Sequence, residues 1–199
     1  MELDQLVNAV MKNLFVELEA SGRHVHLTAQ QAKTLFGHGL TPERELSQPG
    51  QFVAKERVAV IGPKGKFENV AVLGPERPAA QVEISLTDGR TLGIQPPVRP
   101  SGDVAGTPGV TLEGPCGRVQ LSQGVMAAQR HIHMNTADAA KLGVQDKQQV
   151  RLQTYTARPV IFDNVTVRIH PSFQTSVHLD YDEANACGFQ KGDLGRILP

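Results

Sequence analysis

The chain contains one short motif twice, and this repeat constrains the fold more than any other feature of the sequence. Residues 23–27 read Arg-His-Val-His-Leu, and residues 130–134 read Arg-His-Ile-His-Met. A short helical pattern follows each copy, with Thr28 and Thr136 as expected N-caps and a glycine as the expected stop. Such self-similarity predicts two related structural units within one chain.

The repeat continues beyond the motif. Residues 68–72 correspond in sequence to residues 163–167. Glu83 follows Asn69 by fourteen residues, and His178 follows Asn164 by the same number. Across the whole chain, 19 glycines and 13 prolines separate short runs rich in β-forming residues. Short strands at this spacing favour a barrel or a sandwich. We therefore expect a mainly β protein of two related units, each with short helices.

The N-terminal residues follow a different pattern. Apolar residues from Leu3 to Leu18 recur at the spacing of one helix face, which predicts an amphipathic helix over residues 1–20. The helix could pack on its own domain, or it could be a detachable segment that docks in a groove of a partner protein. Its polar face is mostly acidic, which disfavours a membrane-seeking helix.

Composition excludes several classes of protein. Lys plus Arg and Asp plus Glu number 20 each and Trp is absent, so neither a general nucleic-acid binder nor a single-strand stacking platform is expected. No apolar run reaches the ~20 residues of a membrane span, and no secretory leader is recognisable, so we expect an intracellular protein. Cys116 and Cys187 match no zinc-finger or disulfide spacing. Either could be a nucleophile, but their counterparts in the repeat are not cysteines, so we expect packing roles for them.

The repeated histidines predict metal binding. Side chains two residues apart lie on the same face of a strand, so each His-x-His pair can contact one ion. The repeat supplies a third ligand at the equivalent place in each half. The sets His24, His26, Glu83 and His131, His133, His178 then resemble catalytic zinc sites, which commonly have three protein ligands and an open position. His38 and His170, outside these sets, are expected to be ordinary surface residues.

Arg77 indicates what such metals act on. It lies six residues before Glu83, in a segment with Gly74, Pro75 and Pro78. A guanidinium held beside a metal suits phosphate or carboxylate, although a solvated loop arginine is the alternative. No phosphate-binding P-loop, dinucleotide motif or Gly-x-Ser-x-Gly elbow is present in the sequence.

The combined motifs resemble those of a known family, the PduL-type phosphate propanoyltransferases, which are phosphotransacylases of bacterial microcompartments. The resemblance covers about residues 21–198. The segments that carry it are 21–27, 48–51, 62–65, 81–85, 129–134 and 182–186.

The resemblance implies a fold and a set of site residues. It implies two β-barrel domains with short capping helices: residues 23–129 as one, and residues 130–199 with about 21–22 as the other. It implies two zinc ions per subunit at the interface of the barrels, held by the two sets above, and Arg77 as the catalytic, phosphate-binding arginine. The positions that match coenzyme A contacts are Ser21, Gly22, Arg23 and Asn185, with Arg44 as a further candidate.

Two positions depart from the family pattern. Gly22 stands where the family often has Asn, which removes a side-chain hydrogen bond. Leu86 stands where the family often has Arg, which makes an anion site less positive.

The implied function is reversible transfer of a propanoyl or acetyl group between coenzyme A and phosphate. The N-terminal helix then resembles a segment that docks cargo to a microcompartment shell or to other cargo, which places the protein in the microcompartment lumen. The sequence does not decide whether the chain forms homo-oligomers. Two alternatives are a non-catalytic zinc-binding scaffold of microcompartment cargo and a zinc hydrolase.

Overall fold

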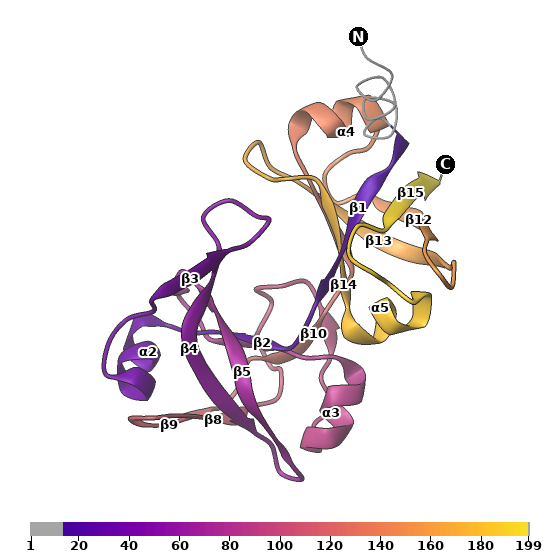
Figure 1. Cartoon of the computed structure of the whole chain (residues 1–199). Coiled ribbons are helices and arrows are strands. Elements are labelled where there is room, and N and C mark those ends of the chain that lie inside the picture. Colours follow the sequence, from indigo (N-terminus) through magenta and orange to yellow (C-terminus); the bar gives the residue numbers. More distant parts are fainter. Residues whose placement is uncertain (1–13, 199) are drawn as a thin grey trace. The chain divides into compact units, whose positions relative to one another are not determined.

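The computed structural model describes residues 14–198 and divides the chain into two compact units. The His24 unit comprises Gly22–Ala128. The His131 unit joins the described residues up to Ser21 with the chain from Gln129 onward. The His131 unit is therefore formed by two segments of the chain, one before and one after the His24 unit in the sequence (Figure 1).

The His131 unit is a closed barrel with strand order β1-β14-β11-β13-β12-β15. Apolar side chains on alternate positions of the strands fill its interior, among them Leu18, Ile132 and Leu179. The strands are β1 Val16–Ser21, β11 His131–Met134, β12 Gln149–Tyr155, β13 Ile161–Ile169, β14 Ser176–Asp180 and β15 Leu194–Leu198, and the helices are α4 Thr136–Leu142 and α5 Tyr181–Cys187.

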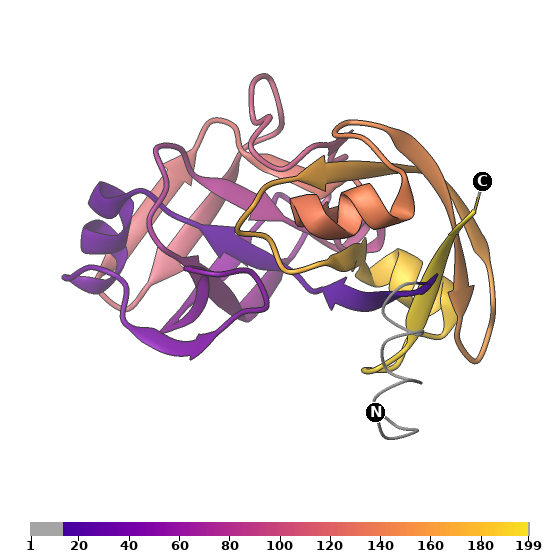
Figure 2. The same cartoon turned by 90° about the horizontal axis from the view of Figure 1, so that it is seen from above.

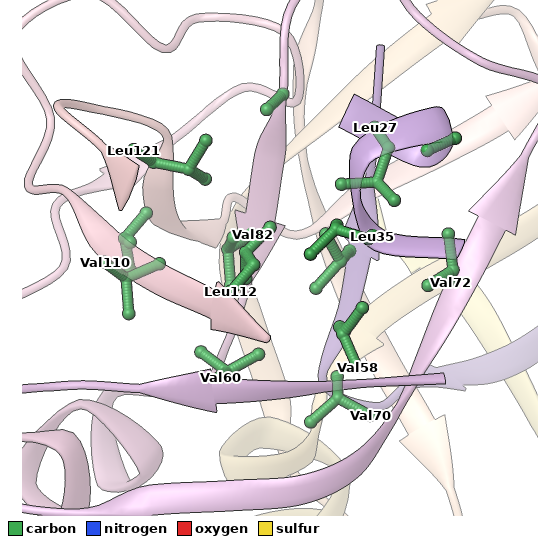
Figure 3. Close-up of a cluster of buried hydrophobic side chains, with 14 of the residues drawn as sticks. Leu27, Leu35, Val58, Val60, Val70, Val72, Val82, Val110, Leu112 and Leu121 are labelled. Atoms are coloured by element: carbon green, nitrogen blue, oxygen red, sulfur yellow. The ribbon is translucent and has the colours of Figure 1, made fainter. Parts of the chain in front are cut away.

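The His24 unit contains a nine-stranded sheet with the order β7-β10-β6-β2-β5-β4-β8-β9, with β3 paired to β4. The labelled side chains of Figure 3, such as Val60, Leu112 and Leu35, belong to the buried cluster that this sheet and α2 share. The strands are β2 His24–His26, β3 Pro42–Glu45, β4 Phe52–Ile61, β5 Lys66–Gly74, β6 Gln81–Glu83, β7 Val98–Arg99, β8 Val110–Gly114, β9 Gly117–Leu121 and β10 Val125–Ala128, and the helices are α2 Ala29–Phe36 and α3 Leu86–Leu92.

The expected fold class is confirmed: the described chain is mainly β, with one closed barrel, one curled sheet and short helices. The repeat is visible in the backbone itself. Asn69 in β5 and Asn164 in β13 both adopt the left-handed conformation, with φ of 57° and 55°. Asparagine tolerates this region better than most residues, which accounts for its presence at both positions.

The strand that precedes each motif is exchanged between the units. β1 ends just before the first motif but pairs in parallel with β14 of the His131 unit. β10 ends just before the second motif but pairs in parallel with β6 of the His24 unit. Figure 2 shows the indigo strand β1 beside the orange and yellow strands of the C-terminal half. Each unit is therefore built from both halves of the repeat.

Two local predictions need correction. The helix expected over residues 1–20 is wrong from Val16 onward, because Val16 and Leu18 alternate with exposed Glu17 and fill the barrel interior as strand residues. Of the residues before Val16, residues 1–13 lie outside the described residues. The N-cap of α4 is Asn135 rather than Thr136, because Asn135 Oδ1 accepts a hydrogen bond from the Asp138 amide at 2.8 Å. Thr28 caps α2 as expected.

None of the helices described between residues 14 and 198 is long and apolar enough to cross a bilayer.

The placement of β1 predicts a stability effect. Leu18 is 1% exposed inside the barrel, so Leu18→Ala should lower the free energy of unfolding by about 2–5 kcal/mol. The exposed Glu17→Ala is the matched control and should change it by less than about 0.5 kcal/mol. Urea unfolding monitored by circular dichroism measures both, and equal effects would contradict the placement of Leu18 in the core.

Candidate metal centres

Two groups of three side chains have the composition and spacing of metal sites. One is His24, His26 and Glu83, and the other is His131, His133 and His178; within each, the ligand atoms lie within 4.8 Å of one another. These are the two sets expected from the sequence, and each lies within a single unit.

Strand register brings the first and third members of each group together. His24 of β2 lies directly opposite Glu83 of the antiparallel β6. His131 of β11 lies directly opposite His178 of the antiparallel β14. Val25 and Ile132, the residues between the paired histidines, point into the two cores, so the ligands share the opposite face of each sheet.

Backbone carbonyls fix the orientation of three imidazoles. His24 Nδ1 lies 2.8 Å from the Gly22 oxygen, and His131 Nδ1 lies 2.8 Å from the Gln129 oxygen. His26 Nδ1 lies 3.2 Å from the Leu73 oxygen. A carbonyl oxygen can only accept, so Nδ1 carries a proton in each ring, and in the neutral imidazole Nε2 has the lone pair that a metal would use.

The Glu83 carboxylate is held by two residues that the sequence did not single out. Its Oε1 accepts hydrogen bonds from Ser101 Oγ at 2.9 Å and from Gln81 Nε2. Gln81 is itself held by the Gly102 amide at 2.7 Å. Glu83 Oε2 faces His24 Nε2 at 3.5 Å. One oxygen is thus fixed by the protein while the other faces the histidine.

Gln81 could have been found from the sequence, because it lies two residues before Glu83 and so shares its face. Ser101 lies in a turn 18 positions from Glu83 and carries no comparable signal.

Burial and charge control the protonation of the first group. Burial lowers the pKa of His26 to about 3, helped by positive charge at His24 and Arg77. Burial also tends to lower the pKa of His24, but the Glu83 carboxylate outweighs it and leaves that pKa above 6.5. Burial tends to raise the pKa of Glu83, yet His24 and His26 hold it well below its usual range. Near neutral pH the group therefore combines a neutral His26 with an ionised Glu83.

In the second group the nitrogens face each other directly. His133 Nδ1 lies 3.1 Å from His178 Nε2, and Ser176 Oγ lies 3.1 Å from the same nitrogen. The rings of His131 and His178 stack with centroids 5.1 Å apart and an interplanar angle of 4°. Three imidazoles converge here on the surface of the barrel sheet opposite its core.

Arg77 lies near the first group, as expected. Its amide donates to the Leu27 oxygen at 2.8 Å, directly after the first motif. Its guanidinium donates to Ser101 Oγ at 3.5 Å. Its positive charge disfavours protonation of both motif histidines, although Glu83 keeps the pKa of His24 raised. Arg77 and the Glu83 carboxylate thus contact the same serine.

The two motif arginines hold helix N-termini. Arg23 donates to both Asp88 carboxylate oxygens, at 2.7 and 3.1 Å, and lies 4.1 Å over the Phe67 ring. Arg130 donates to Glu183 at 2.7 Å and lies 5.7 Å from the centre of the Phe162 ring. Asp88 and Glu183 occupy equivalent positions in the capping boxes of α3 and α5. Each arginine therefore fixes its histidine strand to the helix that follows the third ligand.

The remaining predicted residues lie in different places. Ser21 ends β1, and Gly22 orients His24 through its carbonyl. Arg44 lies on the exposed strand β3 and Asn185 on an exposed turn of α5, in different units. His38 and His170 are exposed. Cys187 is buried in the barrel core, where burial raises the pKa of its thiol, whereas Cys116 is exposed.

Comparison with known proteins identifies the family of this chain. Residues 17–190 match the family described as phosphate propanoyltransferase. The chain belongs to the phosphate propanoyltransferase family. It is 55% identical over 199 residues to the phosphate propanoyltransferase of Enterococcus faecalis, a match that covers 99% of this chain and 94% of the relative.

Two further relatives carry the same name. The Listeria monocytogenes protein is 52% identical over 198 residues, covering 98% of this chain and 93% of the relative. The Thermotoga maritima protein is 51% identical over 181 residues, a match that covers 89% of this chain and 86% of the relative. The name describes a transferase that acts on acyl groups, so this member of the phosphate propanoyltransferase family is an enzyme.

The protonation of the first group predicts how many protons a metal displaces. At pH 5.5 an ordinary histidine is mostly protonated, but His26 stays neutral because its pKa is about 3. Metal binding should then release about one proton, from His24, rather than two. Below the raised pKa of His24, affinity should fall as that proton competes with the metal.

Calorimetry with zinc in buffers of different ionisation enthalpy measures the number of protons released. The variant His131→Ala/His133→Ala limits binding to the first group. Release of two protons at pH 5.5 would contradict the prediction.

The hydrogen bond from Ser101 predicts a second effect on the same group. Removing a group that orients a metal ligand typically costs roughly 10–100-fold in metal affinity. Ser101→Ala should therefore weaken zinc binding to the first group by about this factor, as measured by competition with a chelating dye. Ser122→Ala, on an exposed turn, should leave the affinity unchanged; equal affinities in the two variants would refute a role for Ser101.

Proposed function

We propose that this enzyme transfers a short acyl group, propanoyl or acetyl, reversibly between coenzyme A and phosphate, giving acyl phosphate. One observation supports the proposal: an arginine and a group of side chains that could hold a metal lie together in a chain of this family. Arg77 and Glu83 both bond to Ser101, and Glu83 faces His24.

The side chains fit zinc. Both groups offer imidazole nitrogen, the first adds a carboxylate oxygen, and neither contains a thiolate. Sets of two His with Glu and of three His are those of catalytic zinc sites, which leave a position open for a substrate. Glu83 supports this assignment, because Ser101 and Gln81 hold one of its oxygens while the other faces His24. We assign one zinc ion to each group.

Arg77 is the residue that binds and orients phosphate in this proposal. Its guanidinium can bond two phosphate oxygens at once and so fix the direction of a third. Leu86, 47% exposed at the start of α3, contributes no charge where the family often has arginine. We expect phosphate binding in this enzyme to depend correspondingly more on Arg77.

Coenzyme A is assigned to Ser21, Gly22, Arg23, Arg44 and Asn185 on the strength of the family resemblance. Gly22 can offer only its backbone. The Arg23 guanidinium bonds to Asp88, so a contact from Arg23 to coenzyme A comes most simply from its backbone as well.

The reaction follows from these roles. A phosphate oxygen attacks the carbonyl carbon of the thioester, the new carbon–oxygen bond forms, and the carbon–sulfur bond breaks to release coenzyme A as thiolate. Zinc, when bound, supplies Lewis-acid stabilisation of the negative charge that develops on oxygen and sulfur. Arg77 reduces the entropy cost of the encounter by holding phosphate in one orientation. Ser101 keeps Glu83 and Arg77 in fixed positions, since it bonds to both.

Residues 1–13 carry most of the apolar stripe that resembles a shell-docking segment. We propose that they bind a microcompartment shell or cargo protein and so place the enzyme in the microcompartment lumen. A non-catalytic zinc scaffold with the same docking segment is the competing function.

The proposal predicts turnover that needs both phosphate and metal. Release of coenzyme A from acetyl- and propanoyl-coenzyme A should require phosphate, stop on chelation and return with added zinc. Arg77→Ala should raise KM for phosphate at least tenfold, because the bidentate, charge-assisted hydrogen bonds of the guanidinium are lost. Arg77→Lys should restore part of the phosphate binding. Arg158→Ala is the control. A folded, zinc-loaded protein without turnover would refute the enzyme assignment and favour the scaffold.

A further inference from the structure

A carboxylate lies beside the three-histidine group and has no part in the proposed function. Glu19 of β1 lies directly opposite His178 of β14, and His178 lies directly opposite His131 of β11. Three adjacent strands therefore carry Glu19, His178 and His131 in one row across the barrel sheet.

Glu19 is on the same face of the sheet as these ligands. Leu18, its neighbour in β1, points into the barrel core together with Ile132 and Val177, the neighbours of the histidines. Side chains alternate along strands, so Glu19 points to the opposite side with His131 and His178.

The Glu19 oxygen lies near the nitrogen of His178 that belongs to the candidate site. Glu19 Oε2 lies 3.7 Å from His178 Nε2, whereas Glu83 Oε2 in the other group lies 3.5 Å from His24 Nε2. Nitrogen and oxygen ligands at about 2.0–2.2 Å from one tetrahedral zinc ion are themselves about 3.3–3.5 Å apart. Glu19 is outside the group whose ligand atoms all lie within 4.8 Å of one another, so its carboxylate must turn toward His131 and His133 to reach an ion held there.

Glu19 differs in chemistry from the residue at the equivalent position in the other half of the repeat. Glu19 and Met126 each precede the arginine of a motif by four residues. Met126 lies directly opposite Glu83 on β6 just as Glu19 lies opposite His178 on β14, but Met126 is fully buried and apolar. The carboxylate of the second group is thus displaced by one strand relative to Glu83 in the first.

We infer that Glu19 is a ligand of the metal held by His131, His133 and His178. Both groups then contain one carboxylate, which offsets part of the charge of a divalent ion that three neutral imidazoles leave uncompensated. This inference rests on the proposed metal use of that group. It gives the group four protein ligands, so that an anionic substrate enters by displacing the Glu19 carboxylate.

The test measures metal binding rather than turnover. In His24→Ala/His26→Ala, zinc binds only to the second group, and its affinity is measured by competition with a chelating dye. Adding Glu19→Gln should weaken binding at least tenfold. Glu17→Gln, which removes an exposed carboxylate from the same face of β1, should leave it unchanged. Equal affinities of the Glu19 and Glu17 variants would overturn the inference, and Glu19 would then be only an ion-pair partner of His178.

A second measurement keeps both groups intact. The otherwise unmodified chain loaded with ¹¹³Cd should give two resonances, assigned by the loss of one in His178→Ala and a shift of the other in Glu83→Gln. Glu19→Gln should shift only the resonance of the His178 group, and an unmoved resonance would overturn the inference. Neither readout uses acyl-coenzyme A. Failure of the acyl-transfer proposal would instead appear as absent turnover in a chain that binds both ions.

Discussion

The pairing of a short motif strand with the strand of the third ligand is the constraint on which both candidate sites depend. β2 and β6 are only three residues long, yet their register sets His24 against Glu83. A shift of one residue in that register would turn Glu83 toward the core and Val82 toward the histidines. The same holds for β11 and β14 with His178. Core packing of Val25 and Ile132 therefore has a chemical consequence, because it fixes which side chains meet on the opposite face.

The arginine of each motif reinforces this register from the side. Arg23 joins β2 to the first turn of α3, and Arg130 joins β11 to the first turn of α5. Each of these helices begins soon after the third ligand, so the ion pair connects the two ends of one candidate site. The ion pair of Arg23 includes two hydrogen bonds and an aromatic contact, a geometry in which lysine is no substitute for arginine. Both halves of the repeat thus contain the same combination of candidate ligands, a motif arginine and the capped helix that this arginine contacts.

The sequence was sufficient to predict the parts that the repeat encodes. Two copies of the motif and the equal spacing to Glu83 and His178 predicted both groups of candidate ligands that the structure brings together, and the β-rich runs between glycines and prolines predicted the fold class. The structure of Val16–Ser21 was missed because Leu14, Phe15 and Leu18 suit a helix face as well as a strand, and only long-range pairing with β14 decides between them. Ser101 was missed for a similar reason, since its role depends on a turn that approaches β6 from elsewhere in the chain. Glu19 was missed because it is one of several acidic residues on the polar face of the expected helix, and only the pairing of β1 with β14 brings it beside His178.

The exchange of β1 into the His131 unit has a consequence for the order of folding. Glu19 and His178 are neighbours in the sheet but 159 positions apart in the chain. Loops of this length close slowly, because the chain loses conformational entropy before the stabilising contacts between the distant strands form. A chain growing from the ribosome holds all strands of the His24 unit well before β14 appears, so that unit can fold while β1 waits unpaired. The barrel closes only when the last strands are released, and β1 then joins the earliest described part of the chain to the latest.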